Sequence, residues 1–242
     1  MKKHGFLFLL ILALACTAGA LAAGNASVTQ ETLFVIPNEK GAVVAVLFGE
    51  ITNTGDSPVV IGHAEFAFLN PMGEAIGGGR HYGFCPEIVG AGEKAFFAIS
   101  HPIELAAGDT NIERHSVALV EKPATKGNLL LQATCDYNTY VSYDPATCST
   151  DESNEPEGVL VTNLYATIEN QTDTIAANPT VVWAVYDTDG MLIYVCTERA
   201  DGVGLFPGSK IQLSTRIDPG IQVFLSASER QIGEVTATAW YK

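Results

Sequence analysis

Basic residues are scarce in this chain of 242 residues. Thirteen Lys and Arg stand against 27 Asp and Glu, which gives a formal net charge of −14. If Lys2 and Lys3 leave with a cleaved leader, 11 basic residues remain against the same 27 acidic ones, and the net charge becomes −16. A surface this acidic repels phosphate backbones, so the composition excludes a nucleic-acid partner.

The chain also lacks the short motifs that carry most metal and hydrolytic chemistry. It contains no CxxC pair, no HExxH or HxH pattern and no GxSxG elbow. Metal binding requires several ligands that converge, whereas the four histidines that follow the predicted leader are scattered at positions 63, 81, 101 and 115. We therefore predict no catalytic, cofactor-binding or metal-binding residues.

Two short segments come nearer to a binding motif. Asp187-Thr188-Asp189-Gly190 begins like a calcium loop but lacks the later ligands of an EF-hand. Gly77-Gly78-Gly79-Arg80 would need a helix behind it to hold phosphate, and no helix is expected there. We interpret the first as a turn and the second as a hairpin or bulge.

Only one long apolar run occurs, and it lies at the N-terminus. It extends from Gly5 to Ala15, follows Lys2 and Lys3, and is followed by small residues up to Ala23. This arrangement predicts a secretory signal peptide over residues 1–23, and hence a secreted or cell-surface protein. The alternative is lipid attachment at Cys16, because Leu-Ala-Leu-Ala-Cys resembles a bacterial lipoprotein site; membrane contact is expected only in that case.

Helical periodicity is almost absent after the leader, and β-forming runs alternate with turn residues. An all-β fold of two tandem immunoglobulin-like antiparallel β-sandwiches is therefore expected. The first repeat spans residues 31–122 and the second spans 127–242, with a short linker around Pro123 to Gly127. Strands are predicted at 32–36, 43–52, 59–69, 74–77, 93–100, 114–121, 128–134, 159–169, 180–187, 190–197, 209–217 and 233–241.

The division into two repeats comes from internal similarity. Two blocks recur at an offset of 117 residues, and a third recurs after one deletion. The matched blocks are 49–53 with 166–170, 66–73 with 183–190, and 91–94 with 207–210.

Alternation within the repeats predicts which strand faces are buried. Phe66 and Trp183 occupy equivalent positions on faces that are wholly apolar, so both are expected in cores. The opposite face of the second repeat carries Val182, Ala184 and Tyr186, and is expected closer to solvent.

These blocks resemble the FxLYD domain family. Trp183-Ala184-Val185-Tyr186-Asp187 followed by Gly190 is similar to its signature, as are Ala166 to Asn170 and Leu205-Phe206-Pro207-Gly208. Trp183 stands where the family has Phe, and Asn70 of the first copy stands where it has Asp. The resemblance implies an immunoglobulin-like sandwich of exported bacterial proteins, with no general activity.

An insertion distinguishes the second copy. We predict an acidic surface loop over 135–158, which is polar from Ser149 to Gly158. Cys135 and Cys148 bracket part of it and form the candidate disulfide, although the four mature cysteines allow three pairings. Cys85 and Cys196 have no cysteine counterparts in the other repeat, and a contact between them is not expected.

The sequence therefore predicts a non-enzymatic binding or structural module of the bacterial cell envelope. Its partner would be an unknown protein or envelope polymer, and the insertion is the candidate contact. The alternative is a carbohydrate-binding accessory or hydrolytic protein. It would use loop carboxylates and the C-terminal aromatic residues Trp240 and Tyr241, which could instead pack the last strand.

Overall fold

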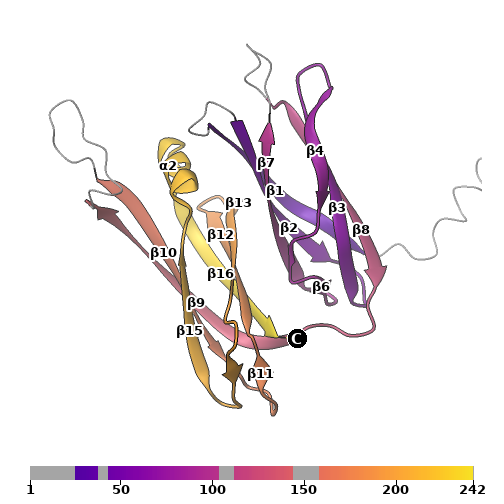
Figure 1. The fold of residues 1–242 in the computed structure, drawn as a ribbon, viewed down its shortest axis with the longest axis vertical. Coiled ribbons are helices and arrows are strands. Elements are labelled where there is room, and N and C mark those ends of the chain that lie inside the picture. The colour runs from indigo at the N-terminus through magenta and orange to yellow at the C-terminus, as the bar shows by residue number, and fades with distance from the viewer. Residues whose placement is uncertain (1–24, 38–42, 104–111, 144–157, 242) are drawn as a thin grey trace, which may run out of the picture.

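The computed structural model describes residues 25–37, 43–103, 112–143 and 158–241, and its fold is mostly β, with antiparallel sheets and one short helix in this part of the chain (Figure 1). The predicted signal peptide, Cys16 and Cys148 lie outside the described residues. Each predicted strand range overlaps a strand of the structure, so the all-β prediction is confirmed at this level.

The strands of the N-terminal half form two sheets around one hydrophobic cluster. One sheet has the order β1-β2-β7-β5, and the other has β4-β3-β6 with β8 also paired to β3. The bounds are β1 Ala26–Pro37, β2 Val43–Asn53, β3 Val59–Leu69, β4 Ala75–His81, β5 Phe84–Cys85, β6 Ile88–Val89, β7 Lys94–Ile103 and β8 Arg114–Pro123.

The C-terminal half contains a six-stranded sheet of order β13-β12-β16-β9-β10-β15 and the small pair β11-β14. The bounds are β9 Leu129–Ser142, β10 Val159–Glu169, β11 Ala176–Ala177, β12 Thr180–Asp187, β13 Leu192–Arg199, β14 Gly204–Leu205, β15 Lys210–Arg216, α2 Pro219–Ala227 and β16 Ile232–Tyr241. Strand β9 pairs with β16 only at 129–131, whereas it pairs with β10 over 132–142. The far ends of β9 and β10 therefore form a two-stranded ribbon beyond the six-stranded sheet.

The predicted core faces are confirmed in both halves. Phe66 is 9% exposed and Trp183 is fully buried. Their same-face neighbours are buried as well, namely Ala64 and Phe68 on β3, and Val181 and Val185 on β12. The strand register deduced from alternation is therefore correct at these positions.

Equivalent turns in the two halves make equivalent hydrogen bonds. Asn70 Oδ1 accepts from the backbone N–H groups of residues 72 and 74, and Asp187 Oδ1 accepts from those of residues 189 and 191. Both turns end in a glycine with positive φ, +82° at Gly73 and +77° at Gly190. The Asp187 carboxylate thus fulfils the turn role that the sequence predicted for it.

The two halves pack against each other through a polar network centred on the buried carboxylate of Glu50 on β2. Glu50 Oε2 accepts from Tyr186 Oη at 2.6 Å and from Lys94 Nζ at 2.9 Å, while Glu50 Oε1 accepts from Thr29 Oγ1 at 2.9 Å. Gln30 of β1 adds a second link, because its Oε1 accepts from Leu192 N and its Nε2 donates to Gly190 O.

Apolar side chains also take part in this contact between the halves, and their burial contradicts one prediction about β12. Phe34, Phe48 and Phe96 of the N-terminal half belong to the same hydrophobic cluster as Val182, Ala184 and Tyr186. The latter three are buried, so placing this face of β12 closer to solvent was wrong. The face is apolar because it is covered by the other half of the chain.

Two further predictions need correction. Residues 135–142 belong to β9 and pair with β10, so the predicted acidic loop 135–158 is wrong over this stretch. Its Tyr, Thr and Val residues favour strand structure. The near absence of helix was also wrong for 219–227, which forms α2.

Candidate binding cleft

Helix α2 follows β15 directly, and its first turn is well capped. Asp218 Oδ1 accepts from Gly220 N at 2.8 Å and from Ile221 N at 3.3 Å, and Pro219 stands at the start of the helix. A carboxylate cap and a proline in the first turn both favour helix initiation. The local sequence thus specifies a helix where the repeat pattern indicates only strands.

The helix is anchored on two sides. Ile221 and Leu225 are buried in the C-terminal cluster, and the Phe224 ring meets Phe34 of β1 edge-on, with ring centroids 4.8 Å apart. In Figure 1, α2 lies between the β9–β10 ribbon and the N-terminal half. Its position is therefore fixed by both halves of the chain.

The wall opposite the helix is one face of the β9–β10 ribbon. Cross-strand pairs join Tyr137 with Leu164, Thr139 with Thr162, and Val141 with Leu160. The two threonine hydroxyls lie 2.9 Å apart and hydrogen-bond each other, and Tyr137 Oη reaches Ile232 O at 3.5 Å. This ribbon face is thus apolar with a central pair of hydroxyls.

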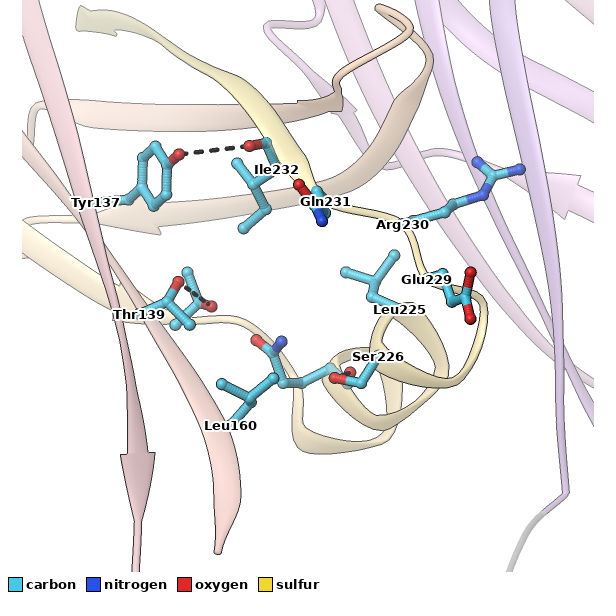
Figure 2. Close-up of a pocket in the computed structure, with 11 residues that line it drawn as sticks. Tyr137, Thr139, Leu160, Leu225, Ser226, Glu229, Arg230, Gln231 and Ile232 are labelled. Carbon is cyan, nitrogen blue, oxygen red and sulfur yellow. Dashed lines mark hydrogen bonds between the residues drawn. The ribbon is translucent and has the colours of Figure 1, made fainter.

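A cleft of about 650 Å³ lies between this face and α2 (Figure 2). A second hollow of about 520 Å³ continues from it along the helix, and the two share Leu160, Gln222 and Ser226. The first is lined by Tyr137, Thr139, Leu160, Thr162, Gln222, Leu225, Ser226, Glu229, Arg230, Gln231 and Ile232. The second adds Gly158, Val159, Val223 and Ala227. Volumes of this size are typical of ligand sites.

The interior of the cleft is uncharged. Its charged lining residues are Glu229 and Arg230, and both side chains point away from the space between Tyr137 and Leu225 in Figure 2. Arg230 also approaches Asp187 Oδ2 at 3.5 Å, outside the cleft. The walls therefore suit a neutral ligand with apolar groups.

Gln222 is the polar residue of the cleft that lacks a partner. Its side chain is buried, with 6% of the residue exposed, and its Oε1 accepts no hydrogen bond in the structure. A buried amide oxygen without a donor is costly, and such groups are rare in folded proteins. Gln222 is thus available to a donor on a bound molecule. No motif marked it in the sequence, since its role depends on the unexpected helix.

Glu229, which follows the end of the helix at the rim of the cleft, has an unusual backbone conformation. Glu229 has φ of +57°, and Arg230 N donates to Leu225 O at 3.1 Å to close the last turn. This left-handed position after a helix normally favours glycine. A residue with a strained backbone therefore lies beside the opening.

Of the candidate residues that the sequence suggested, those in the predicted insertion 135–158 contribute to the cleft, through Tyr137 and Thr139. The other candidates lie outside it. Trp240 and Tyr241 are each 6% exposed, so they pack the last strand and offer no open stacking face. Among the described residues, no group of three or more His, Cys, Asp or Glu side chains could hold a metal ion. Cys135 Sγ lies 3.0 Å from Val235 O. Its predicted pairing with Cys148 stays a prediction, because Cys148 lies outside the described residues.

Cys85 and Cys196 line one small cavity of about 230 Å³ between the two halves, where no contact was expected. Both are free thiols, and Cys85 hydrogen-bonds Thr197 while Cys196 hydrogen-bonds Tyr194. Burial raises the pKa of both, that of Cys196 to about 12. The two thiols thus have separate partners.

Comparisons with known proteins identify neither a family nor a function for this chain. No family model matches the chain, and no curated protein matches it. Among solved structures, red sea bream transglutaminase is similar at 10% identity with a TM-score of 0.22, over 86% of this chain and 28% of that one. This chain thus spans less than a third of that protein's length. Within the described residues, no helix has the length and apolar character needed to cross a membrane.

Proposed function

We propose that the protein is a non-enzymatic binding module of the bacterial cell envelope, made of two tandem immunoglobulin-like sandwiches that resemble the FxLYD family. It is exported by the leader at 1–23 and acts as a secreted or cell-surface protein, attached to the membrane only if lipid is added at Cys16. Its partner is a protein or envelope polymer that enters the cleft between α2 and the β9–β10 ribbon.

The observation that carries this proposal is the cleft with the buried, unpartnered oxygen of Gln222. Ligand sites usually combine apolar walls with polar groups that fix the orientation of the ligand, and this cleft has both kinds of lining residue. The cleft also lies at the end of the C-terminal half, where the ribbon projects beyond the main sheet. Sandwich ends are common recognition surfaces.

The hydrolytic alternative finds less support in the cleft. Glycoside hydrolysis usually needs two carboxylates that flank the bond, whereas Glu229 is the single carboxylate among the lining residues and points away. The sugar-stacking form of the alternative depended on Trp240 and Tyr241, whose burial removes that argument.

The test is binding of the mature protein to isolated bacterial envelope fractions. Ser226 is exposed on α2 and lines both hollows, so Ser226→Trp should fill the cleft and abolish binding without unfolding the protein. Ser214→Trp, at an exposed position on β15, is the matched control and should bind normally. Equal binding by the two variants would refute a role for the cleft. Turnover of a glycan, peptide or ester that one Asp or Glu neutralisation abolishes would refute the non-enzymatic proposal.

A further inference from the structure

The cleft has two compartments, each with an apolar part, and they meet at a shared wall that carries polar side chains. Tyr137, Leu225 and Ile232 contribute apolar surface to the first, and Val159, Val223 and Ala227 contribute it to the second. Leu160, Gln222 and Ser226 line both and therefore stand between them. A ligand that fills the whole cleft needs two apolar groups with a hydrogen-bonding group between them.

The amide of Gln222 defines the kind of hydrogen bond. Its Oε1 is an acceptor without a donor, so the complementary group on the ligand is an N–H or O–H. The two charged lining residues, Glu229 and Arg230, point away from the space between Tyr137 and Leu225 (Figure 2). This argues against an ionic ligand, because a buried charge without a partner is strongly unfavourable. The ligand's central group is therefore a neutral donor.

Within the described part of the chain, a strand edge without a second partner borders the second compartment. Strand β10 pairs with β15 from Asn163 onward, and the described strands pair with its first residues, 159–161, from the β9 side alone. Of these residues, Val159 and Leu160 line the hollow against α2. Unpaired strand edges recognise extended peptides by main-chain hydrogen bonds, with pockets for alternate side chains.

We propose that the cleft binds an extended, uncharged peptide segment with the pattern apolar–small–apolar. Alternate residues of an extended chain point to the same side and lie about 6.6 Å apart, which suits two compartments that share a common wall. The main-chain N–H between the two apolar side chains donates to Gln222 Oε1. This assignment depends on the proposed binding function and specifies its ligand as peptide rather than glycan.

The probe is the capped tripeptide acetyl-Leu-Ala-Leu-amide, titrated into ¹⁵N-labelled mature protein and followed by NMR. Saturable shifts are expected at Leu160, Gln222 and Ser226. The matched analogue carries an N-methyl group on its alanine and so lacks the central donor; its affinity should fall about tenfold, the loss of one hydrogen bond. Acetyl-Glu-Ala-Glu-amide should not bind, because its charges would enter a neutral cleft.

Gln222→Met separates a binding role from a structural one. It keeps the size of the side chain and removes the unpartnered oxygen, so the free protein should keep or raise its melting temperature while its affinity for acetyl-Leu-Ala-Leu-amide falls about tenfold. Gln212→Met, at an exposed position on β15, is the control and should change neither. A Gln222→Met variant that melts lower yet binds the tripeptide as well as before would overturn the assigned role of Gln222.

Three outcomes separate this inference from the proposed function. If the tripeptide causes no shifts while envelope binding persists and is lost in Ser226→Trp, the peptide assignment fails and the binding function stands. Shifts at the same residues with chitotriose in place of the tripeptide would make the ligand a glycan. If the tripeptide binds but envelope fractions do not, the site holds and its placement at the envelope fails.

Discussion

Glu50 shows how a single residue links the two halves of the chain. It is 3% exposed and accepts hydrogen bonds from Thr29, Lys94 and Tyr186, which come from three different strands. Burial by itself raises the pKa of this carboxyl, but the three hydrogen bonds and the Lys94 charge outweigh it and hold the pKa below its ordinary value of 4.5. Burial and the hydrogen bond to Glu50 raise the pKa of Tyr186, which stays protonated as the donor.

This lowered pKa makes a prediction about acid stability. A carboxyl whose pKa is lower in the folded state than in the unfolded state stabilises the fold at pH values above the unfolded-state pKa. This stabilisation is lost as the pH falls through the folded-state pKa. Glu50→Gln should therefore cost about 1–3 kcal/mol at pH 7, and the difference from the wild type should shrink below pH 4.5. Urea unfolding at a series of pH values measures it. Glu65→Gln, at an exposed ion pair with Arg80, is the control. A difference independent of pH would contradict the proposed ionisation.

The thiols allow a second prediction at the residue scale. Burial raises the pKa of Cys85, Cys135 and Cys196, and the thiolate is the form that reacts. Alkylation by iodoacetamide at pH 8 should thus be much slower in the native protein than in urea, and slowest at Cys196, whose pKa is raised to about 12. Peptide mapping without reduction reads the rates and also tests the predicted Cys135–Cys148 link. Rapid native labelling of Cys196 would show that it is not buried in solution.

At the scale of the element, the end of α2 is suboptimal for stability. Glu229 adopts φ of +57°, a conformation that glycine reaches without the steric cost borne by other residues. Glu229→Gly should therefore raise the free energy of unfolding by about 0.5–1 kcal/mol, as measured by urea denaturation. Ser228→Gly is the matched control, because φ of Ser228 is −91° and glycine gains nothing there. Equal effects of the two substitutions would count against backbone strain at Glu229.

The elements also show what could be predicted from the sequence. Period-two alternation located the long strands and the buried faces of Phe66 and Trp183, because one face of each strand packs into a core. Alternation could not reveal α2, since nine residues span only about two and a half helical turns and the stability of the helix depends on packing against Phe34 and the C-terminal cluster. The cleft and Gln222 were missed for the same reason. The ribbon was missed because its polar strand residues resemble a loop.

At the scale of the whole molecule, the contact between the halves was the largest feature that the sequence did not predict. Val182 and Ala184 are fully buried on the face of β12 that was expected near solvent. A strand that is apolar on both faces is ambiguous in sequence, because a second sheet, a helix or another half of the chain can cover it. The similarity between the repeats concealed the burial of this face in the second copy, because the first copy has Glu65 at the position equivalent to Val182.

The contact predicts how the whole chain unfolds. Phe48 is 3% exposed and meets Tyr194 edge-on across the contact, with ring centroids 5.4 Å apart. Because Phe34, Phe48 and Phe96 belong to the C-terminal cluster, the halves should unfold together in one calorimetric transition. Phe48→Ala should remove about 3–5 kcal/mol and separate this transition into two, one for each half. Met72→Ala, at a side chain 74% exposed, is the control and should leave a single transition. Two transitions in the wild type that Phe48→Ala leaves unchanged would show that the halves fold independently, and the network around Glu50 would then contribute little to stability.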